Sequence, residues 1–307
     1  MKRFIVSLVF FLLGWLFVSA IADYAITRYI RTLPTRNVTL WNELLSSNLN
    51  DDMVYIGSSR AMNSYNTQVI DSILGIKSYN LGMMAQFHDY NYFMYDILKQ
   101  YNRKPKYVVW DVFYRTLDET GPWCDFQFTP FINNTELYYK LNDYQSTISF
   151  FDKTIPLYRY YKYSIFDFPI KWFSKDSCFH NGFVPNNNKW DDNNLKQLDE
   201  EEIKSSFSKK GVDFMHKAIQ NMKSEGTTVI LVYSPFHKKG RDKVENFDKM
   251  ANTFQNIADK EEIVFLNFLN DSINNDTTYF VGAVHLNGKG ADCFSRKVAQ
   301  SLIPIVK

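Results

Sequence analysis

The stretch MVYIGSSRAM, residues 53–62, begins as a short apolar run and changes abruptly at GSSR, residues 57–60. Uninterrupted apolar residues followed by a glycine are typical of a buried strand that ends in a tight turn. The turn would deliver Ser59 to the start of a helix. A serine in that place can be an ordinary helix N-cap, or it can be a nucleophile that the turn presents to a substrate.

Short apolar runs alternate with amphipathic segments along most of the remaining chain. Uniformly apolar strands separated by helices indicate a parallel sheet that is covered on both faces. We therefore predict an α/β fold, a three-layer sandwich with one mainly parallel sheet. Strands are expected at residues 53–56, 78–82, 106–112, 227–235 and 262–269, and helices at 66–75, 89–101, 209–224, 242–258 and 288–302.

The ends of these predicted strands indicate where the chemistry of the protein should lie. In open parallel sheets, active sites form at the carboxyl ends of the strands. Ser59, Gly82, Val112 and Ser234 all occupy such positions. We expect them to line one edge of the sheet.

Residues 113–205 interrupt the alternation with aromatic segments such as LYRYYKYSIFDFPIKWF and with a long polar run. The tract is too aromatic for a disordered linker. It is interpreted either as an insertion or lid folded over the carboxyl edge of the sheet, or as a structural subdomain without a ligand role. The expected organisation is an N-terminal anchor and juxtamembrane helix at 1–36, followed by an α/β domain at 37–307 that carries the insertion.

The N-terminus contains an uncharged segment of 19 residues, 4–22, after Lys2 and Arg3. As a helix it would be about 28 Å long, close to the hydrocarbon thickness of a bilayer. The segment therefore predicts a single-pass membrane protein that contacts the lipid bilayer through residues 4–22, with its soluble domain on the extracytoplasmic side. Cleavage after Ala22 would instead give a secreted or periplasmic protein. Because an amphipathic helix continues past Ala22, we favour the uncleaved anchor.

The composition argues against several classes of protein. The net charge is +2 and no basic cluster is present, which argues against a nucleic-acid partner. The five histidines are dispersed and no nucleotide-binding or zinc-protease motif occurs, so neither a metal nor a cofactor is expected. Three cysteines are too few for a disulfide scaffold; a Cys124–Cys178 bridge and three unpaired thiols, including Cys293, both stay open.

Three short motifs occur in a characteristic order. YIGSSR ends the first predicted strand, YNLGMMAQ ends the second, and AVHLNGKGADCFS precedes the last helix. In this order the sequence resembles the SGNH/GDSL hydrolase superfamily, and most closely its membrane-anchored branch, which is associated with acyl groups on cell-envelope polymers. The resemblance implies an SGNH/flavodoxin-like sheet. It covers about two thirds of the soluble domain.

Carried over to this sequence, the resemblance implies Ser59 as the nucleophile and His285 as its general base. It also implies an oxyanion hole formed by the backbone N–H groups of Ser59 and Gly82. A serine hydroxyl becomes an effective nucleophile only when a neighbouring imidazole accepts its proton, and the resulting oxyanion needs fixed N–H donors.

The sequence departs from the family pattern in two places. The acid that the family supplies three residues before its histidine is replaced by Gly282, so Asp276, Asp271 or a main-chain carbonyl would have to support His285. The asparagine of the family's third motif is also absent, and Asp111 stands in that strand instead.

Two further charged positions have open roles. Asp111 could contact substrate or could be a strand-end residue bonded to backbone amides. Arg60 could hold an anionic group of a substrate or could be structural. The aromatic residues are interpreted mainly as packing residues rather than as sugar platforms; they are Trp123, Tyr138, Tyr139, Trp172 and Trp190.

Two functions therefore compete at the level of sequence. The first is a membrane-anchored Ser-His hydrolase or acyltransferase that acts on acyl esters, chiefly O-acetyl esters, of a carbohydrate or cell-envelope polymer. The second is a catalytically silent domain of the same fold that binds a glycan or a membrane partner. Gly282 and the missing asparagine favour the second function; the ordered motifs favour the first.

Overall fold

The computed structural model describes residues 1–118, 123–144, 146–163, 179–193 and 208–306. The chain forms two compact units. One unit comprises Met1–Leu45 with Pro122–Ser177, and the other comprises Ser46–Gly121 with Cys178–Lys307. The second unit contains the sheet and is described first.

Five parallel strands form the sheet of this unit, in the order β2-β1-β3-β4-β5. This is the order of doubly wound folds in which the chain reverses direction across the sheet between β1 and β3. The predicted α/β fold with one parallel sheet is confirmed. The strands are β1 (Met53–Ile56), β2 (Ser78–Asn80), β3 (Tyr107–Val112), β4 (Thr228–Tyr233) and β5 (Val264–Asn267).

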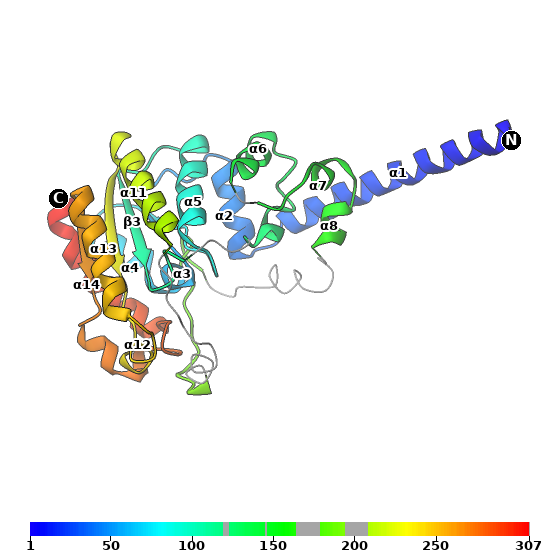
Figure 1. Ribbon diagram of the computed structural model, residues 1–307. Coiled ribbons are helices and arrows are strands. Elements are labelled where there is room, and N and C mark those ends of the chain that lie inside the picture. The colour runs from blue at the N-terminus through cyan, green and yellow to red at the C-terminus, as the bar shows by residue number, and fades with distance from the viewer. Residues whose placement is uncertain (119–122, 145, 164–178, 194–207, 307) are drawn as a thin grey trace. The chain divides into compact units, whose positions relative to one another are not determined.

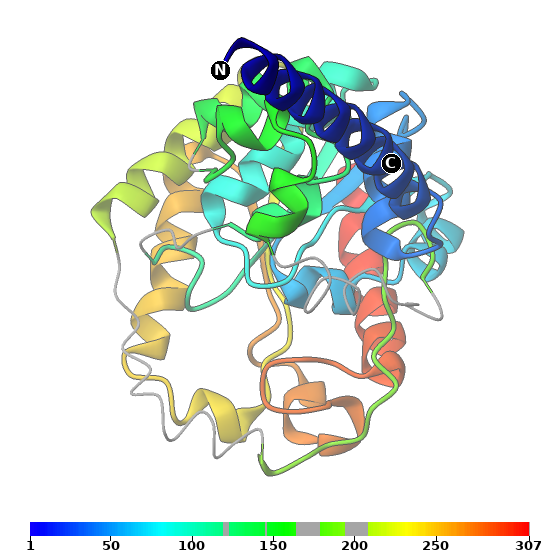
Figure 2. The ribbon, with the colours of Figure 1, turned by 90° about the vertical axis from the view of Figure 1, so that its right-hand side faces the viewer.

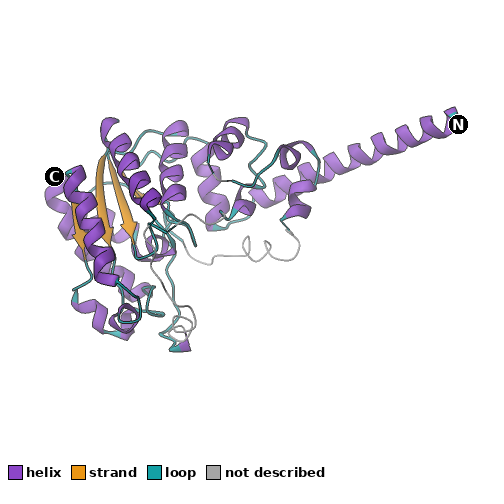
Figure 3. Ribbon diagram, viewed as in Figure 1, coloured by secondary structure: helices purple, strands orange, loops and turns teal. Residues whose placement is uncertain are grey.

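Helices cover both faces of the sheet (Figure 3). One face is covered by α3 (Ser59–Ser64), α4 (Thr67–Leu74) and α14 (Gly288–Val306), which lie side by side in Figure 2. The other face is covered by α5 (His88–Tyr101), α11 (Lys209–Ser224) and α13 (Phe247–Glu261). The remaining elements of this unit are α12 (Lys238–Arg241), η2 (Ser272–Asn275) and η3 (Thr277–Tyr279).

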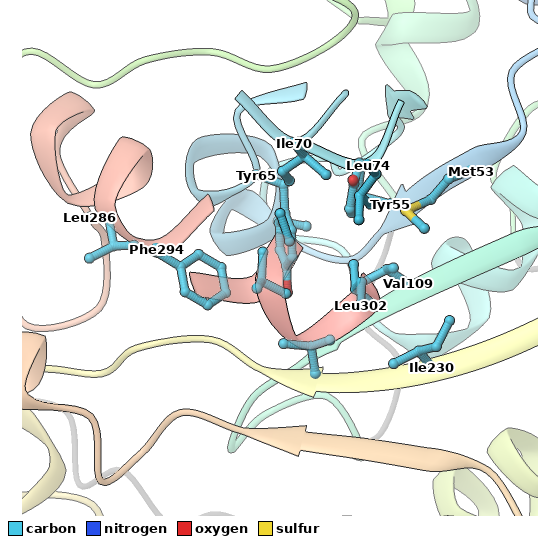
Figure 4. Close-up of a cluster of buried hydrophobic side chains, with 14 of the residues drawn as sticks. Met53, Tyr55, Tyr65, Ile70, Leu74, Val109, Ile230, Leu286, Phe294 and Leu302 are labelled. Atoms are coloured by element: carbon cyan, nitrogen blue, oxygen red, sulfur yellow. The ribbon is translucent and has the colours of Figure 1, made fainter. Parts of the chain in front are cut away.

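The core on the α14 side explains why the central strands are uniformly apolar. Tyr55 of β1 stacks on Tyr65 with ring centroids 4.8 Å apart, and Phe294 of α14 meets Tyr65 edge-on at 5.2 Å. Figure 4 shows Ile70 and Leu74 of α4 above the same strand. Because these side chains are almost completely buried, they hold α3 and α14 against β1 and thereby position the loops at the carboxyl edge.

One predicted helix, at 242–258, has a different boundary. The chain forms the short α12 first and then turns, because Asn246 adopts a left-handed conformation with φ of 58°. Asparagine tolerates this conformation better than most residues. Helix α13 therefore begins only at Phe247.

The other unit contains the N-terminal helix and part of the aromatic tract. Helix α1 (Lys2–Arg31) is long and apolar enough to cross a membrane. With it lie α2 (Arg36–Leu45), η1 (Asp125–Phe128), α6 (Thr135–Asp143), α7 (Phe150–Thr154) and α8 (Tyr158–Lys162).

This division differs from the organisation expected from sequence. Residues 122–177 belong with the N-terminal helices rather than with the α/β domain. The physical reason is aromatic packing: Trp41 of α2 lies 5.1 Å from the Phe128 ring and 6.3 Å from that of Phe131, and its indole N–H donates to Gln127 Oε1 at 3.3 Å. The remainder of the predicted insertion from residue 178 belongs to the unit that contains the sheet.

Candidate active site

Two side chains far apart in the sequence meet at the carboxyl edge of the sheet. Ser59 Oγ lies 2.8 Å from Nε2 of His285. Ser59 begins α3 directly after β1, and β1 borders the point at which the strand order reverses. Ligands of doubly wound folds bind at this kind of switch point.

The turn between β1 and α3 explains how the serine is presented. Gly57 has φ of +154°, and a Cβ there would lie 2.7 Å from Ala61 Cβ and 3.0 Å from Asp111 Cβ. Only glycine fits this backbone without strain. Ser58 then caps the helix, because its Oγ accepts a hydrogen bond from the Arg60 N–H at 3.3 Å. The capping role that the sequence left open for Ser59 thus belongs to Ser58, and the Ser59 hydroxyl faces His285.

His285 is held in the loop between η3 and α14. Its carbonyl accepts a hydrogen bond from the Val281 N–H at 3.0 Å, and Phe280 and Leu286 form a β-bridge across the loop. Burial lowers the pKa of His285 to about 4, and the nearby positive charge of Arg60 acts in the same direction. The ring is therefore neutral at pH 7, the state in which Nε2 can accept the Ser59 proton.

The low pKa of His285 gives a direct prediction. In an NMR titration, the His285 ring signal, assigned by its loss in His285→Gln, should shift with a midpoint near pH 4 rather than near the ordinary 6.5. Because the unfolded chain would bind this proton at higher pH than the folded chain, the free energy of unfolding should decrease as pH falls from about 6.5 to 4. A midpoint close to 6.5 would show that the ring is solvated.

The structure does not bring the two aspartates named from sequence to His285. Both carboxylate oxygens of Asp271 bind Lys297 Nζ, at 2.5 and 2.7 Å, while Asp276 is exposed and accepts a hydrogen bond from the Thr278 N–H at 2.9 Å. Within the described ranges, no carboxylate or main-chain carbonyl hydrogen-bonds to Nδ1 of His285. Each aspartate caps a short 3₁₀ helix. From sequence alone, an aspartate that caps a helix cannot be distinguished from one that accepts a hydrogen bond from a catalytic histidine.

Gly82 has a different role from the oxyanion donor expected of it. Its N–H donates to Asn80 Oδ1 at 3.0 Å, and a Cβ at Gly82 would lie 2.5 Å from the Met62 nitrogen. Glycine is therefore required here because β2 approaches the backbone of α3 closely. By contrast, the N–H of Ser59, in the first turn of α3, has no acceptor among the described residues, so it stays a candidate oxyanion donor.

Asn80 is a positioning residue that the sequence motifs do not single out. Besides accepting the Gly82 N–H, its amide donates to the carbonyls of Ala61 at 2.8 Å and of Tyr65 at 3.2 Å. It fixes the helix that begins with Ser59. The only signal in the sequence is an asparagine inside a predicted buried strand.

Arg60 is buried beneath the site, and its guanidinium is bonded to the main chain. Its side chain is 1% exposed, and its guanidinium donates to the Val284 carbonyl at 2.8 Å and to the carbonyl and hydroxyl of Ser234, both at 2.7 Å. It thus joins the Ser59 turn, the end of β4 and the residue that precedes His285. Because the guanidinium is bonded to internal carbonyls, these contacts favour the structural alternative for Arg60 over a ligand contact.

Asp111 is also buried beneath the site rather than exposed to a ligand. Oδ1 accepts a hydrogen bond from the Tyr65 hydroxyl at 2.8 Å, and Oδ2 lies 3.9 Å from Arg60 Nε. Complete burial raises the pKa of Asp111, against the opposing effect of the Arg60 charge. The side chain is 1% exposed, so the expected substrate contact is corrected to a buried partner of Arg60.

Comparisons with known proteins add little beyond this geometry. No family model matches the sequence, and no curated protein matches it. A solved acetyl xylan esterase is 13% identical, with 83% of this chain and 99% of that chain covered and a TM-score of 0.41. A GDSL-like lipase from Bacteroides thetaiotaomicron is 11% identical, with coverages of 81% and 87% and a TM-score of 0.36. Similarities this low carry no information about the activity or the site residues of this chain.

A strap formed by residues 179–193 runs across this unit and ends near the site. The Val184 N–H donates to the Met62 carbonyl at 3.1 Å, and the Asp191 N–H donates to the Val281 carbonyl at 2.9 Å. At its end Trp190 lies 4.5 Å from the His237 ring, between ring centroids. The strap thus connects α3, which carries Ser59, with the loop that carries His285.

Trp123, Tyr138 and Tyr139, which were also singled out from sequence, lie in the unit of α1. Trp123 is buried and lies 5.6 Å from the ring of Tyr144, which is packing as predicted. Lys153 Nζ makes cation–π contacts with both Tyr138 and Tyr139, at 4.7 and 5.5 Å from their ring centroids. Trp172 lies outside the described residues.

In the ranges that the structure describes, no cluster of three or more His, Cys, Asp or Glu side chains is placed to hold a metal ion. The Cys124–Cys178 pairing involves Cys178, which lies outside the described residues. Cys293 is in α14, within the unit that contains the sheet.

Proposed function

We propose that this protein is a membrane-anchored serine esterase or acyltransferase of the SGNH type. The observation that carries the proposal is the 2.8 Å separation between Ser59 Oγ and Nε2 of a half-buried, neutral His285. This distance allows direct proton transfer from hydroxyl to imidazole. The position of the pair at the switch point of the sheet supports the same function.

The chemistry follows from the two side chains. Ser59 Oγ attacks the acyl carbon while its proton passes to His285 Nε2, and the protonated ring then returns this proton to the departing alkoxide. The acyl group is left on Ser59. Water, or a sugar hydroxyl in the case of transfer, attacks the acyl-enzyme and gives its proton to His285. The bond between Ser59 Oγ and the acyl group then breaks, His285 returns the proton to Oγ, and the acyl product is released.

Two features of the site predict a slow enzyme. His285 Nδ1 has no carboxylate partner among the described residues, and the Gly82 N–H is occupied by Asn80. In serine proteases, loss of the orienting carboxylate costs about 10⁴-fold in turnover. Here the hydrogen bond from Arg60 to Val284 partly substitutes by holding the backbone next to His285. The same two features favour the second candidate, a silent domain that binds a glycan or a membrane partner.

The anchor and the substrate class are part of the proposal. Helix α1 continues without a break through Ala22 to Arg31, which supports an uncleaved anchor over a processed leader. We place the soluble part on the extracytoplasmic side, where O-acetyl esters of a carbohydrate or cell-envelope polymer would be the substrates. Cleavage after Ala22, giving a secreted or periplasmic form, is the alternative.

The proposal is tested by ester hydrolysis with the full-length protein in nanodiscs. Nitrophenyl acetate, nitrophenyl butyrate and acetylated xylan are compared for wild type, Ser59→Ala and Ser58→Ala. We expect wild type to cleave acetyl esters fastest and Ser59→Ala to fall to background. Ser58→Ala is the matched control. It removes a helix N-cap, which lowers the free energy of unfolding by about 1 kcal/mol, but it keeps the Ser59 hydroxyl. Equal background rates for wild type and Ser59→Ala would favour the silent domain.

A further inference from the structure

Helix α1 has a buried polar face at the end that follows its uncharged segment. Residues 1–18 are exposed, whereas Ser19, Asp23, Thr27 and Ile30 are buried at 5–8% exposure. Their spacing of three or four residues places them on one side of the helix. This part of α1 is therefore packed against protein along one face, and the packing reaches into the last turn of the uncharged segment 4–22.

Helix α8 is fixed to this face by polar contacts. Arg159 forms an ion pair with Asp23 and donates to Thr27 Oγ1 at 3.1 Å, and the Leu157 N–H donates to Asp23 Oδ2 at 2.8 Å. The Tyr160 hydroxyl lies 2.5 Å from Thr27 Oγ1. A paired, buried charge of this kind holds two elements in one register, because breaking it leaves the partner charge unpaired.

These contacts fix the position of α8, and of the preceding α7, along the length of α1. If residues 4–22 fill the hydrocarbon layer, Ser19 to Asp23 lie at its boundary and the elements docked there lie at the level of the lipid headgroups. Figure 1 shows α7 and α8 beside this part of α1, while its N-terminal half extends away from them.

The surface of α7 and α8 has the composition expected at that depth. Phe150 is 65% exposed, Phe151 55%, Ile155 40% and Tyr161 82%. Lys153 lies in the same short segment, as does Lys162, whose ammonium is paired with Asp152 at 2.8 Å. Exposed aromatic residues are unfavourable in water, but they are enriched at membrane interfaces, and nearby lysines attract anionic headgroups.

We propose that residues 150–162, the interfacial segment, form a second membrane contact that lies in the headgroup layer of the bilayer that α1 enters. The inference rests on the proposed anchor. It follows from the buried Asp23–Arg159 pair, which ties the exposed aromatic residues to the end of the uncharged span. The partner is a lipid surface that contains anionic headgroups.

The inference is tested with an environment-sensitive fluorophore on single cysteines. Cys124, Cys178 and Cys293 are replaced by serine, and NBD is attached at Leu12, Phe151 or Val264, all exposed positions at 47%, 55% and 39%. The full-length protein is inserted in vesicles of phosphatidylcholine and phosphatidylglycerol. Leu12 reports the anchor, Phe151 reports the interfacial segment, and Val264 on edge strand β5 is the water-exposed control.

We expect lipids with a nitroxide near the headgroup to quench NBD at position 151 several-fold more than at 264, and lipids with a deep nitroxide to quench position 12. Quenching at 12 with position 151 behaving like 264 would overturn the interfacial segment and leave the anchor intact. No quenching at 12 would overturn both. Protection of position 151 from aqueous iodide without lipid quenching would assign the surface to a protein partner and also overturn the inference.

Discussion

Replacing His285 by alanine is expected to lower the turnover of an acetyl ester by about 100-fold, because a histidine without an orienting carboxylate has already lost part of its contribution. The Ser59 hydroxyl would lose the imidazole that accepts its proton at 2.8 Å, and the leaving alkoxide would lose its proton donor. The measurement is kcat at saturating ester, together with the thermal melting curve. His180→Ala is the control, because that side chain is exposed and does not contact Ser59.

A second readout separates catalysis from folding in this experiment. If His285 acts as the base, the wild-type kcat/KM should fall on the acid side with a midpoint near pH 4, the pKa to which burial lowers the ring. A decrease of less than tenfold in His285→Ala with an unchanged melting curve would remove His285 from the mechanism.

Replacing Arg60 by methionine is expected to lower the free energy of unfolding by about 3–5 kcal/mol. The variant would leave Asp111 buried without its counter-charge, and it would remove the donors to Val284 and Ser234. Lysine cannot replace arginine here, because a single ammonium does not reproduce the fork that reaches several carbonyls at once. Urea unfolding of the detergent-solubilised protein measures the loss.

Two comparisons make the Arg60 prediction specific. Arg103→Met removes an exposed arginine, 51% accessible, from its 3.2 Å pair with Asp52 and should cost less than about 1 kcal/mol. Adding Asp111→Asn to Arg60→Met should recover part of the loss, since the unpaired charge is then absent. If Arg60→Met is no more destabilising than Arg103→Met, Arg60 does not hold the site together.

The sheet and the meeting of Ser59 with His285 could be anticipated because both depend on strong local patterns. Uniformly apolar runs such as VVW in β3 predict buried parallel strands, and the GSSR turn places Ser59 at a strand end. The carboxyl ends of parallel strands share one edge, so a histidine loop that precedes the last helix is expected near them.

The partners of individual polar groups could not be predicted in the same way. Whether Ser58 or Ser59 caps α3, and whether the Gly82 N–H faces a ligand or Asn80, depends on backbone angles and on segments distant in the sequence. Arg60 illustrates the same point. A charged residue beside a candidate nucleophile suggests a ligand contact. The guanidinium of Arg60 instead donates to the carbonyls of Ser234, Pro235 and Val284, which lie in two loops distant in the sequence.

The grouping of residues 122–177 with α1 is a further property that local patterns do not encode. The aromatic composition indicates a packed segment, but the sequence does not specify which apolar surface it covers. The decisive contacts, between Asp23 and Arg159 and between Trp41 and Phe128, join residues more than 80 positions apart.

Covalent labelling shows whether Ser59 is a nucleophile that His285 activates. The full-length protein is reacted with a fluorophosphonate, and the adduct is located by peptide mass spectrometry. We expect a covalent phosphonate on Ser59 in wild type, much slower labelling in His285→Ala, and none in Ser59→Ala. An adduct on another residue, or labelling that is undiminished in Ser59→Ala, would contradict this expectation.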